Sequence, residues 1–353
     1  MTKITQRQNL IIVFIRERGE VGNKEIKEYL QEKIGQLNRV TIIRDLEVLK
    51  SQNLIKQTGR GRNIKYKENI ENKLLIFFDP EGYFNVPIDQ RTLLSERFNF
   101  EVFNYFNNNL FSKKEFGELD KLNADYQKRR GNLSPVILKK EFERLIIELS
   151  WKSSQIEGNT YSLIDTEILI KENREAKGHT KEEAQMILNH KKALDYILNK
   201  KSEFRKITLG KVENIHNLIV EGMGIEKNIR KGLVGITGTK YRPLENEFQI
   251  KEALEKMILI MNKKEIHPLI KSLASVLLIS YIQPFEDGNK RTARLLGNAI
   301  LLVNNYCPLS YRSVDENDYK KATLLFYEQN SVRFFKKLFI GQFKFALENY
   351  FLI

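Results

Sequence analysis

Apolar residues recur every three or four positions through the first fifty residues, which is the spacing of helices with one buried face. Alternating apolar and polar residues, typical of strands, follow on both sides of a glycine-rich turn. The predicted elements are, in order, helices over residues 6–18, 23–35 and 38–49 and strands over residues 53–57 and 64–67. The pattern therefore predicts three short helices and then a hairpin.

The third of these helices has two distinct sides. The apolar side, expected to face the core, carries Val40, Ile43, Leu46 and Leu49. The other side, expected to face outward, carries Asn38, Arg39, Thr41, Ile42, Arg44 and Asp45. An outward face that is largely polar and basic is a candidate interaction surface.

Positive charge is concentrated in the same region. The chain of 353 residues has a formal net charge of +14, and residues 1–67 hold fifteen Lys and Arg against seven Asp and Glu. Such an excess favours a polyanionic partner, and nucleic acid is the first candidate. The alternative is a protein-interaction surface whose charges are solvated.

Residues 1–68 resemble the winged helix-turn-helix family, above all over residues 39–49. The resemblance implies that the third helix enters the major groove of DNA and that the hairpin, the wing, contacts phosphates. The residues that would contact DNA are Asn38, Arg39, Thr41 and Arg44 on the helix and Arg60 and Arg62 on the wing.

Helical periodicity returns in the second half of the chain. Helices are predicted over residues 136–151, 163–173, 181–199 and 209–220. The helix that begins at His267 is apolar nearly all round, which predicts a buried central helix. Between these helices, glycine and β-branched residues alternate over residues 232–243, which predicts a β-hairpin.

Composition excludes several classes of protein. Cys307 is the one cysteine of the chain, so no intrachain disulfide can form, and the four histidines are too scattered to suggest a zinc cluster. The start lacks the apolar core of a signal peptide, and no apolar run reaches membrane-spanning length. We therefore expect a cytoplasmic protein of two domains without a membrane partner.

Residues 283–294 read Gln-Pro-Phe-Glu-Asp-Gly-Asn-Lys-Arg-Thr-Ala-Arg, the densest cluster of chemistry in the chain. Asp287, Gly288 and Asn289 predict a tight turn whose backbone N–H groups can bind an anion at the start of the next helix. Lys290, Arg291 and Arg294 add positive charge, and the aspartate can hold Mg²⁺. The pattern fits a di- or triphosphate. The alternative is a structural helix start whose arginines serve internal carboxylates.

This segment resembles the signature of the Fic family, and the likeness extends over roughly residues 72–350. The resemblance implies a mainly α fold: an all-helical Fic core with a β-hairpin flap, preceded by the small α+β winged helix-turn-helix domain. It also implies transfer of AMP from ATP, with Mg²⁺, to a Ser, Thr or Tyr hydroxyl of a target protein. The domains would be residues 1–70, an arm over 71–130 and the Fic domain over 131–353. Both family resemblances are compatible with a homodimer.

The resemblance also assigns roles to particular residues. The catalytic positions would be Gln283, Asp287 and Arg291, with Asp287 holding the metal. Nucleotide binding would fall to Phe285, Gly288, Asn289, Lys290, Arg291 and Arg294. The flap that aligns the target would comprise Val234, Ile236, Thr237, Gly238 and Thr239. An inhibitory helix near residues 150–159 would carry Ser153, Glu157 and Gly158, with Glu157 pairing with Arg294 and excluding productive ATP.

Two residues depart from the family pattern. Gln283 stands where the family has the histidine that accepts the proton of the attacking hydroxyl, and an amide cannot take up a proton near neutral pH. Lys290 stands where many members have glycine, and Doc-like members with lysine there transfer phosphate, which leaves the transferred group open. Three interpretations follow: an impaired AMP transferase, a non-catalytic nucleotide-sensing regulator that binds DNA, and an enzyme that removes AMP with Glu157 orienting water.

Overall fold

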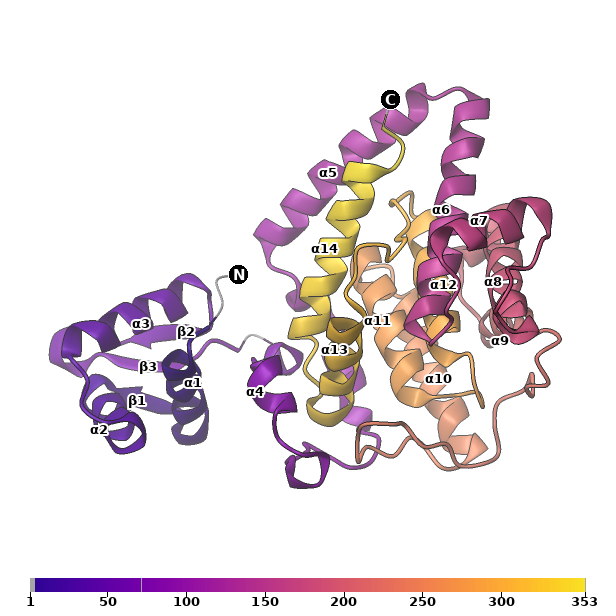
Figure 1. Cartoon of the computed structure of the whole chain (residues 1–353). Coiled ribbons are helices and arrows are strands. Elements are labelled where there is room, and N and C mark those ends of the chain that lie inside the picture. The colour runs from indigo at the N-terminus through magenta and orange to yellow at the C-terminus, as the bar shows by residue number, and fades with distance from the viewer. Residues whose placement is uncertain (1–3, 71, 353) are drawn as a thin grey trace. The chain divides into compact units, whose positions relative to one another are not determined.

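The computed structural model describes residues 4–70 and 72–352, with the backbone alone at Arg62. Clustering of contacts divides the chain into two compact units, residues 1–85 and residues 86–353 (Figure 1). Within the described ranges, no helix combines the length and the apolar character needed to cross a membrane. The two units are taken in turn.

The first unit combines three longer helices and one short helix with a small sheet. Its main elements are α1 (Gln6–Arg18), β1 (Glu20–Gly22), α2 (Asn23–Ile34), α3 (Arg39–Ser51), β2 (Ile55–Thr58), β3 (Lys65–Glu68) and α4 (Pro80–Phe84), with short 3-10 turns at Gly61–Asn63 and Lys73–Leu75. The strand order is β1-β3-β2, and β3 pairs antiparallel with both neighbours. The three helices and the hairpin predicted from the apolar spacing are thus confirmed.

Local signals explain where these helices begin and end. Thr5 and Gln8 form a reciprocal capping box at the start of α1, and Gly19 ends that helix with a φ of 81°. Asn38 caps α3 by accepting a hydrogen bond from the Val40 amide at 3.0 Å. The buried faces of the helices then meet in one core around Ile11, Ile15, Leu30, Leu46 and Leu49.

The predicted orientation of α3 was wrong. Ile42 is only 3% exposed, whereas Val40 is 52% and Ile43 41% exposed. Asp45 is buried because it accepts a hydrogen bond from Gln8 Nε2 at 2.9 Å and pairs with the Arg7 guanidinium, both on α1. This buried polar contact turns α3 so that Val40 and Ile43 lie outside.

The second unit is helical. Its α-helices are α5 (Lys113–Asn132), α6 (Pro135–Ile156), α7 (Leu163–Glu172), α8 (Lys181–Asn199), α9 (Leu209–Ile219), α10 (Glu247–Asn262), α11 (Pro268–Ile282), α12 (Asn289–Val303), α13 (Glu316–Gln329) and α14 (Arg333–Asn349). Short 3-10 turns occur at Ile88–Gln90, Phe100–Tyr105, Asn108–Leu110 and Lys201–Arg205. The prediction of a mainly α fold is confirmed.

Helix α11 is the central helix predicted from its apolar sequence. Residues from every turn of it are buried, and it packs against α10, α12 and α13 (Figure 1). Its approach to α12 is close: a Cβ added at Gly297 would lie 3.0 Å from Val276 Cγ2 and 3.1 Å from Ser272 Oγ. Gln283, in the left-handed conformation with φ 51°, ends α11, and Gly288, with φ 76°, precedes α12. The six residues of the signature between these helices are therefore held on a rigid helix pair.

The predicted β-hairpin over residues 232–243 does not form. All of these residues are described, and they contain a turn at residues 237–238 and one isolated bridge between Arg242 and Arg97, but no strand. Arg230 explains the difference, because its guanidinium donates to the carbonyls of Gly232 at 2.6 Å and Leu244 at 2.5 Å. The two ends of the segment are thus tied to one side chain rather than to each other, and the segment is a loop.

Candidate functional site

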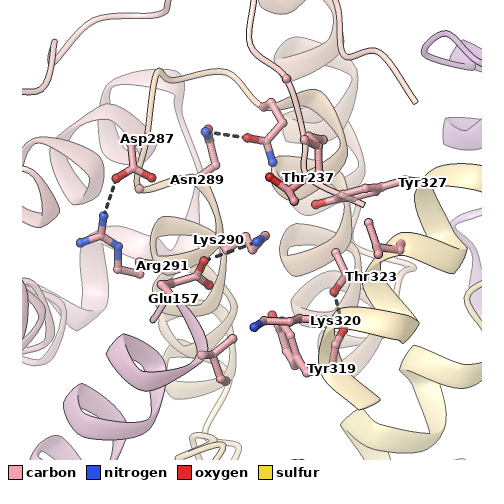
Figure 2. Close-up of a pocket in the computed structure, with 16 residues that line it drawn as sticks. Glu157, Thr237, Asp287, Asn289, Lys290, Arg291, Tyr319, Lys320, Thr323 and Tyr327 are labelled. Carbon is pink, nitrogen blue, oxygen red and sulfur yellow. Dashed lines mark hydrogen bonds and ion pairs between the residues drawn. The ribbon is translucent and has the colours of Figure 1, made fainter. Parts of the chain in front are cut away.

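A cavity of about 390 Å³ lies at the start of α12. Figure 2 shows Asp287, Asn289 and Arg291 on one side of it and Tyr319, Thr323 and Tyr327 of α13 on the other. The residues that line it are Ile156, Glu157, Gly235, Ile236, Thr237, Gln283, Asp287, Gly288, Asn289, Lys290, Arg291, Tyr319, Lys320, Thr323, Leu324 and Tyr327. The end of α6, the 232–243 loop, the signature and α13 therefore form one site.

The turn before α12 is closed by the side chain of Asn289. Its Nδ2 donates to the Phe285 carbonyl at 2.8 Å and to Gln283 Oε1 at 2.9 Å, while its Oδ1 accepts from the Phe285 amide at 2.9 Å. The bonds keep the start of α12 open toward the cavity, and the positive end of a helix dipole attracts anions. The turn is thus organised to bind an anion without help from a ligand.

The side chain of Gln283 is held by two internal hydrogen bonds. Its Nε2 donates to the Ser280 carbonyl at 2.7 Å, and its Oε1 accepts from Asn289. Its backbone carbonyl accepts from Arg230 at 2.6 Å. The amide thus links the end of α11 to the start of α12 and is neutral at every ordinary pH.

Glu157 directly follows α6, and its side chain lines the cavity. Its Oε1 accepts from Arg294 Nη2 at 2.9 Å, and its Oε2 lies 3.4 Å from Lys290 Nζ. Burial alone would raise the pKa of this carboxyl, but the charges of Arg294 and Lys290 outweigh it and lower the pKa. The group is therefore an anion at neutral pH, placed among the cations of the signature.

Arg294 is fully occupied by protein partners. The residue is 0% exposed, and its guanidinium donates to Ser153 Oγ and the Ser153 carbonyl, both at 2.8 Å, and to the Tyr319 hydroxyl at 3.3 Å. Together with Glu157, these contacts hold α6 on α12. The arginine therefore faces the end of α6 rather than the cavity.

Asp287 is the exposed carboxylate of the site. Its side chain is 64% exposed, and its Oδ2 lies 3.1 Å from Nη2 of the buried Arg291. Over the described part of the chain, no three His, Cys, Asp or Glu side chains gather to hold a metal. A single carboxylate beside a phosphate-sized cavity fits Mg²⁺, which takes its remaining ligands from phosphates and water.

Comparisons with known proteins agree on this part of the chain. Residues 206–301 match the model of the Fic/DOC family. Over these residues, which include the signature and most of α12, the chain is similar to that family. A protein adenylyltransferase Fic of Nematostella vectensis is 28% identical over 187 residues, 52% of this chain and 43% of the relative. A probable protein adenylyltransferase of Aquifex aeolicus is 30% identical over 100 residues, 28% of this chain and 31% of the relative. The matches span less than half the length of these curated relatives.

Solved structures of Fic proteins share the fold of about two thirds of the chain. The Fic-1 protein of C. elegans has a TM-score of 0.56 at 19% identity, covering 67% of this chain and 70% of that one. A Fic family protein of Desulfovibrio desulfuricans has a TM-score of 0.55 at 21% identity, covering 67% and 74%. At these identities the likeness establishes the fold alone.

Phe285, which we expected to contact a nucleotide, does not line the cavity. Phe285 is fully buried and stacks on His216, with ring centroids 3.7 Å apart and ring planes 6° apart, so it supports the turn from behind. Ser153 is also buried, and Gly158 follows the end of α6 with a φ of 98°.

The residues expected in the flap line two hollows. Thr237 lines the main cavity, Val234 and Thr239 line a second hollow of about 460 Å³, and Ile236 lines both. Gly238 accepts a hydrogen bond from Arg91 Nη1 at 3.1 Å, which fixes the turn of the loop.

The DNA contacts predicted in the first unit are only partly accessible. Arg39, Arg44 and Arg60 are exposed, and Thr41 is half-buried. The side-chain oxygen of Asn38 caps α3. Arg62 lies in the 3-10 turn between β2 and β3, and its side chain falls outside what the structure describes.

The sequence did not indicate the α13 residues that line the cavity, nor His216 of α9, which supports the turn behind it. Its Nε2 lies 3.0 Å from the Asp287 carbonyl, to which it donates, and its ring supports Phe285. Burial is the main cause that lowers its pKa to about 4, so the ring is neutral at pH 7. The contact joins positions 71 residues apart, so no local sequence pattern predicts it.

Proposed function

We propose that the Fic domain binds ATP with Mg²⁺ in the cavity before α12 and descends from enzymes that transfer AMP to a protein hydroxyl. The observation that carries the proposal is the preformed anion-binding turn, closed by Asn289 and facing the carboxylate of Asp287. Lys290 and Arg291 supply the charge that a phosphate chain needs. The adenylyltransferase relatives support AMP as the transferred group.

We further propose that transfer is slow because the site lacks a base. In the reaction, a target hydroxyl oxygen attacks the α-phosphorus, pyrophosphate leaves and the hydroxyl proton must be accepted. Gln283 cannot accept it, and a missing general base typically costs about 10²–10⁴-fold in rate. Burial raises the pKa of the neighbouring Tyr327 hydroxyl, so it stays protonated. The Nε2 of His216 is occupied by the Asp287 carbonyl. Neither group is placed to substitute.

Magnesium would be held by Asp287 and would neutralise charge on the phosphates. The exposed position of this carboxylate at the cavity supports the assignment. Arg291, now bonded to the same carboxylate, holds it at the edge of the turn.

Glu157 would hold the domain in an inhibited state. Its carboxylate occupies Arg294, the side chain that family resemblance assigns to the terminal phosphate, and it pairs with Lys290 as well. A triphosphate must displace the carboxylate before Arg294 becomes available. We infer that inhibition by the α6 segment accompanies the missing base, so that two separate features suppress transfer.

The target hydroxyl would approach along the 232–243 loop. Gly235 and Ile236 line both hollows, so an extended target segment bound along them would bring its Ser, Thr or Tyr hydroxyl to the main cavity.

One set of variants tests this function. The unaltered chain, Glu157→Gly, and the double variant Gln283→His with Glu157→Gly are incubated with Mg²⁺ and ATP labelled at the α-phosphate, and labelled protein is measured. We expect strong labelling by the double variant alone, because Glu157→Gly releases Arg294 without restoring a base. Strong labelling by the unaltered chain would contradict the impaired-enzyme proposal, and the absence of nucleotide binding by all three would refute the site. ATP labelled at the γ-phosphate separates phosphate transfer from AMP transfer.

The first unit favours a second function, a nucleotide-sensing regulator that binds DNA. We propose that it is a winged helix module, supported by its three helices, its antiparallel hairpin and its exposed Arg39, Arg44 and Arg60. DNA affinity would then depend on the nucleotide bound to the Fic domain. Equal DNA affinity with ATP, with AMP and without nucleotide, at one salt concentration, would count against this regulation.

A further inference from the structure

Two large apolar side chains lie on the outer face of α3, where a solvated helix would carry polar residues. Val40 is 52% and Ile43 41% exposed, and because they are three positions apart they lie on the same side of the helix. Arg39 and Arg44, each next to one of them in the sequence, are also exposed. The face is therefore an apolar pair flanked by two cations.

The exposure of this pair is imposed by the fold. Leu46 and Leu49 fill the inner side of α3, together with Ile42. Asp45 fixes the orientation through its hydrogen bond from Gln8 Nε2 at 2.9 Å and its ion pair with Arg7. Turning α3 to bury Val40 would expose this core and break the buried polar contact. The pair is consequently available to a partner.

The charge around the apolar pair indicates which kind of partner it fits. The surrounding cations and the excess of fifteen basic over seven acidic residues in residues 1–67 favour a polyanion. An α-helix fits the major groove of duplex DNA, where thymine alone among the bases presents a methyl group. An aliphatic side chain cannot satisfy the hydrogen-bonding edges of the other bases, but it can bury that methyl.

We propose that Val40 and Ile43 read the 5-methyl groups of neighbouring thymines in the major groove. The inference rests on the proposal that the first unit binds DNA. Side chains three apart on a helix have Cβ atoms about 5–6 Å apart. Base pairs rise about 3.4 Å each, so the two side chains span one or two base steps. Arg39 and Arg44 supply phosphate or guanine contacts beside them, and the preferred site is rich in adjacent A·T pairs.

The experiment uses the full chain and a pool of random 30-base-pair duplexes. Duplexes retained by the protein are sequenced, and the most enriched one is synthesised twice, once with thymine and once with deoxyuridine, which lacks the methyl. We expect adjacent thymines in the enriched site and a loss of about fourfold in affinity for each contacted methyl removed. The Val40→Ser, Ile43→Ser double variant should bind both duplexes equally. Arg60→Ala, the matched control, should weaken both equally and lower the salt dependence.

The outcomes distinguish a failure of DNA binding from a failure of methyl recognition alone. Failure of the chain to retain any duplex overturns DNA binding and this inference with it. An enriched site that is insensitive to the methyl groups overturns this inference alone and leaves DNA binding standing. A chain that self-associates through these residues, shown by a dimer that the double serine variant abolishes and by unchanged DNA affinity, also overturns it. Circular dichroism confirms that the variants fold, and both serine positions are exposed in the parent.

Discussion

Replacing Glu157 by glutamine should increase the affinity for ATP. The substitution keeps the shape of the side chain and removes its charge, so the carboxylate no longer competes for Arg294 and Lys290. Arg294 keeps its bonds to Ser153 at 2.8 Å and therefore stays in place. The terminal phosphate of ATP then needs to displace only a neutral amide.

The geometry sets the size of the effect. The contact of Glu157 with Arg294 is a charged hydrogen bond of 2.9 Å to a fully buried guanidinium, a class worth about 1.5–3 kcal/mol. The contact with Lys290 is longer, 3.4 Å, and the lysine side chain is partly exposed, so solvent screening leaves it below about 1 kcal/mol. We expect ATP to bind about tenfold to a hundredfold more tightly to the variant.

The same substitution should destabilise the domain without nucleotide. Arg294 remains buried, and removing the charged partner of a buried ion costs about 3–5 kcal/mol, part of which the amide oxygen recovers. The melting temperature should therefore fall in the absence of ligand and rise further on adding ATP than it does for the parent. Calorimetric titration and thermal unfolding measure the two effects on one sample.

AMP and a control variant make the test specific. AMP lacks the terminal phosphates, so its affinity should change little on Glu157→Gln. Glu286→Gln makes the same change of charge at an exposed position of the signature, and we expect it to alter ATP affinity by no more than about threefold. The reasoning is refuted if Glu157→Gln leaves ATP affinity within that range, or if AMP gains as much as ATP.

The remaining predictions concern pH and packing. The pKa of the Glu157 carboxyl is lowered in the folded protein, so its charge stabilises the fold above its ordinary pKa of about 4.3, and this stabilisation is lost as pH falls through the lower, folded-state pKa. The parent should therefore exceed Glu157→Gln in melting temperature by a constant amount from pH 8 to 5. The pKa of His216 is about 4 in the folded protein against an ordinary 6.5, so the unfolded chain takes up a proton first as pH falls. The free energy of unfolding should therefore fall by up to about 3 kcal/mol between pH 6.5 and 4, and denaturant unfolding of His216→Gln should lack this pH dependence. Gly297→Ala should cost about 1–3 kcal/mol in denaturant unfolding because its Cβ would meet Val276 at 3.0 Å. Gly341→Ala in α14, with nothing within 4 Å of the new Cβ, should instead stabilise by up to about 1 kcal/mol, and equal effects of the two would contradict the packing argument.

The sequence predicted the features that depend on local periodicity or on a local motif. The helices of the first unit and the buried α11 are marked by apolar spacing, and the signature is marked by its own residues. The orientation of α3 was missed because Asp45 was counted as outward, whereas ion pairing to Arg7, 38 positions away, buries it. Contacts of this kind, like that between His216 and the Asp287 carbonyl, join distant segments and leave no pattern in the sequence.

The hairpin predicted from alternating glycine and β-branched residues over 232–243 was wrong for a related reason. Glycine and β-branched residues are compatible with a hairpin, but strand pairing also needs the two halves to be free to meet. Arg230 instead holds both ends through backbone carbonyls and also binds the Gln283 carbonyl at 2.6 Å. One buried guanidinium thus ties the loop to the end of α11, which places the loop beside the cavity without strand pairing.

The hydrogen bonds of Gln283 explain why the turn before α12 is organised. The position must donate to the Ser280 carbonyl and accept from Asn289 Nδ2, at 2.7 and 2.9 Å. A neutral imidazole has one donor and one acceptor, and an amide has two N–H donors and a carbonyl acceptor, whereas a carboxylate cannot donate and an aliphatic side chain can do neither. An aliphatic residue would take the side-chain donor away from the Ser280 carbonyl, at about 1–3 kcal/mol, and would leave Asn289 Nδ2 with the Phe285 carbonyl alone. Under the function we propose, glutamine at this position keeps the turn closed but cannot take up a proton, so nucleotide binding and transfer would be separable.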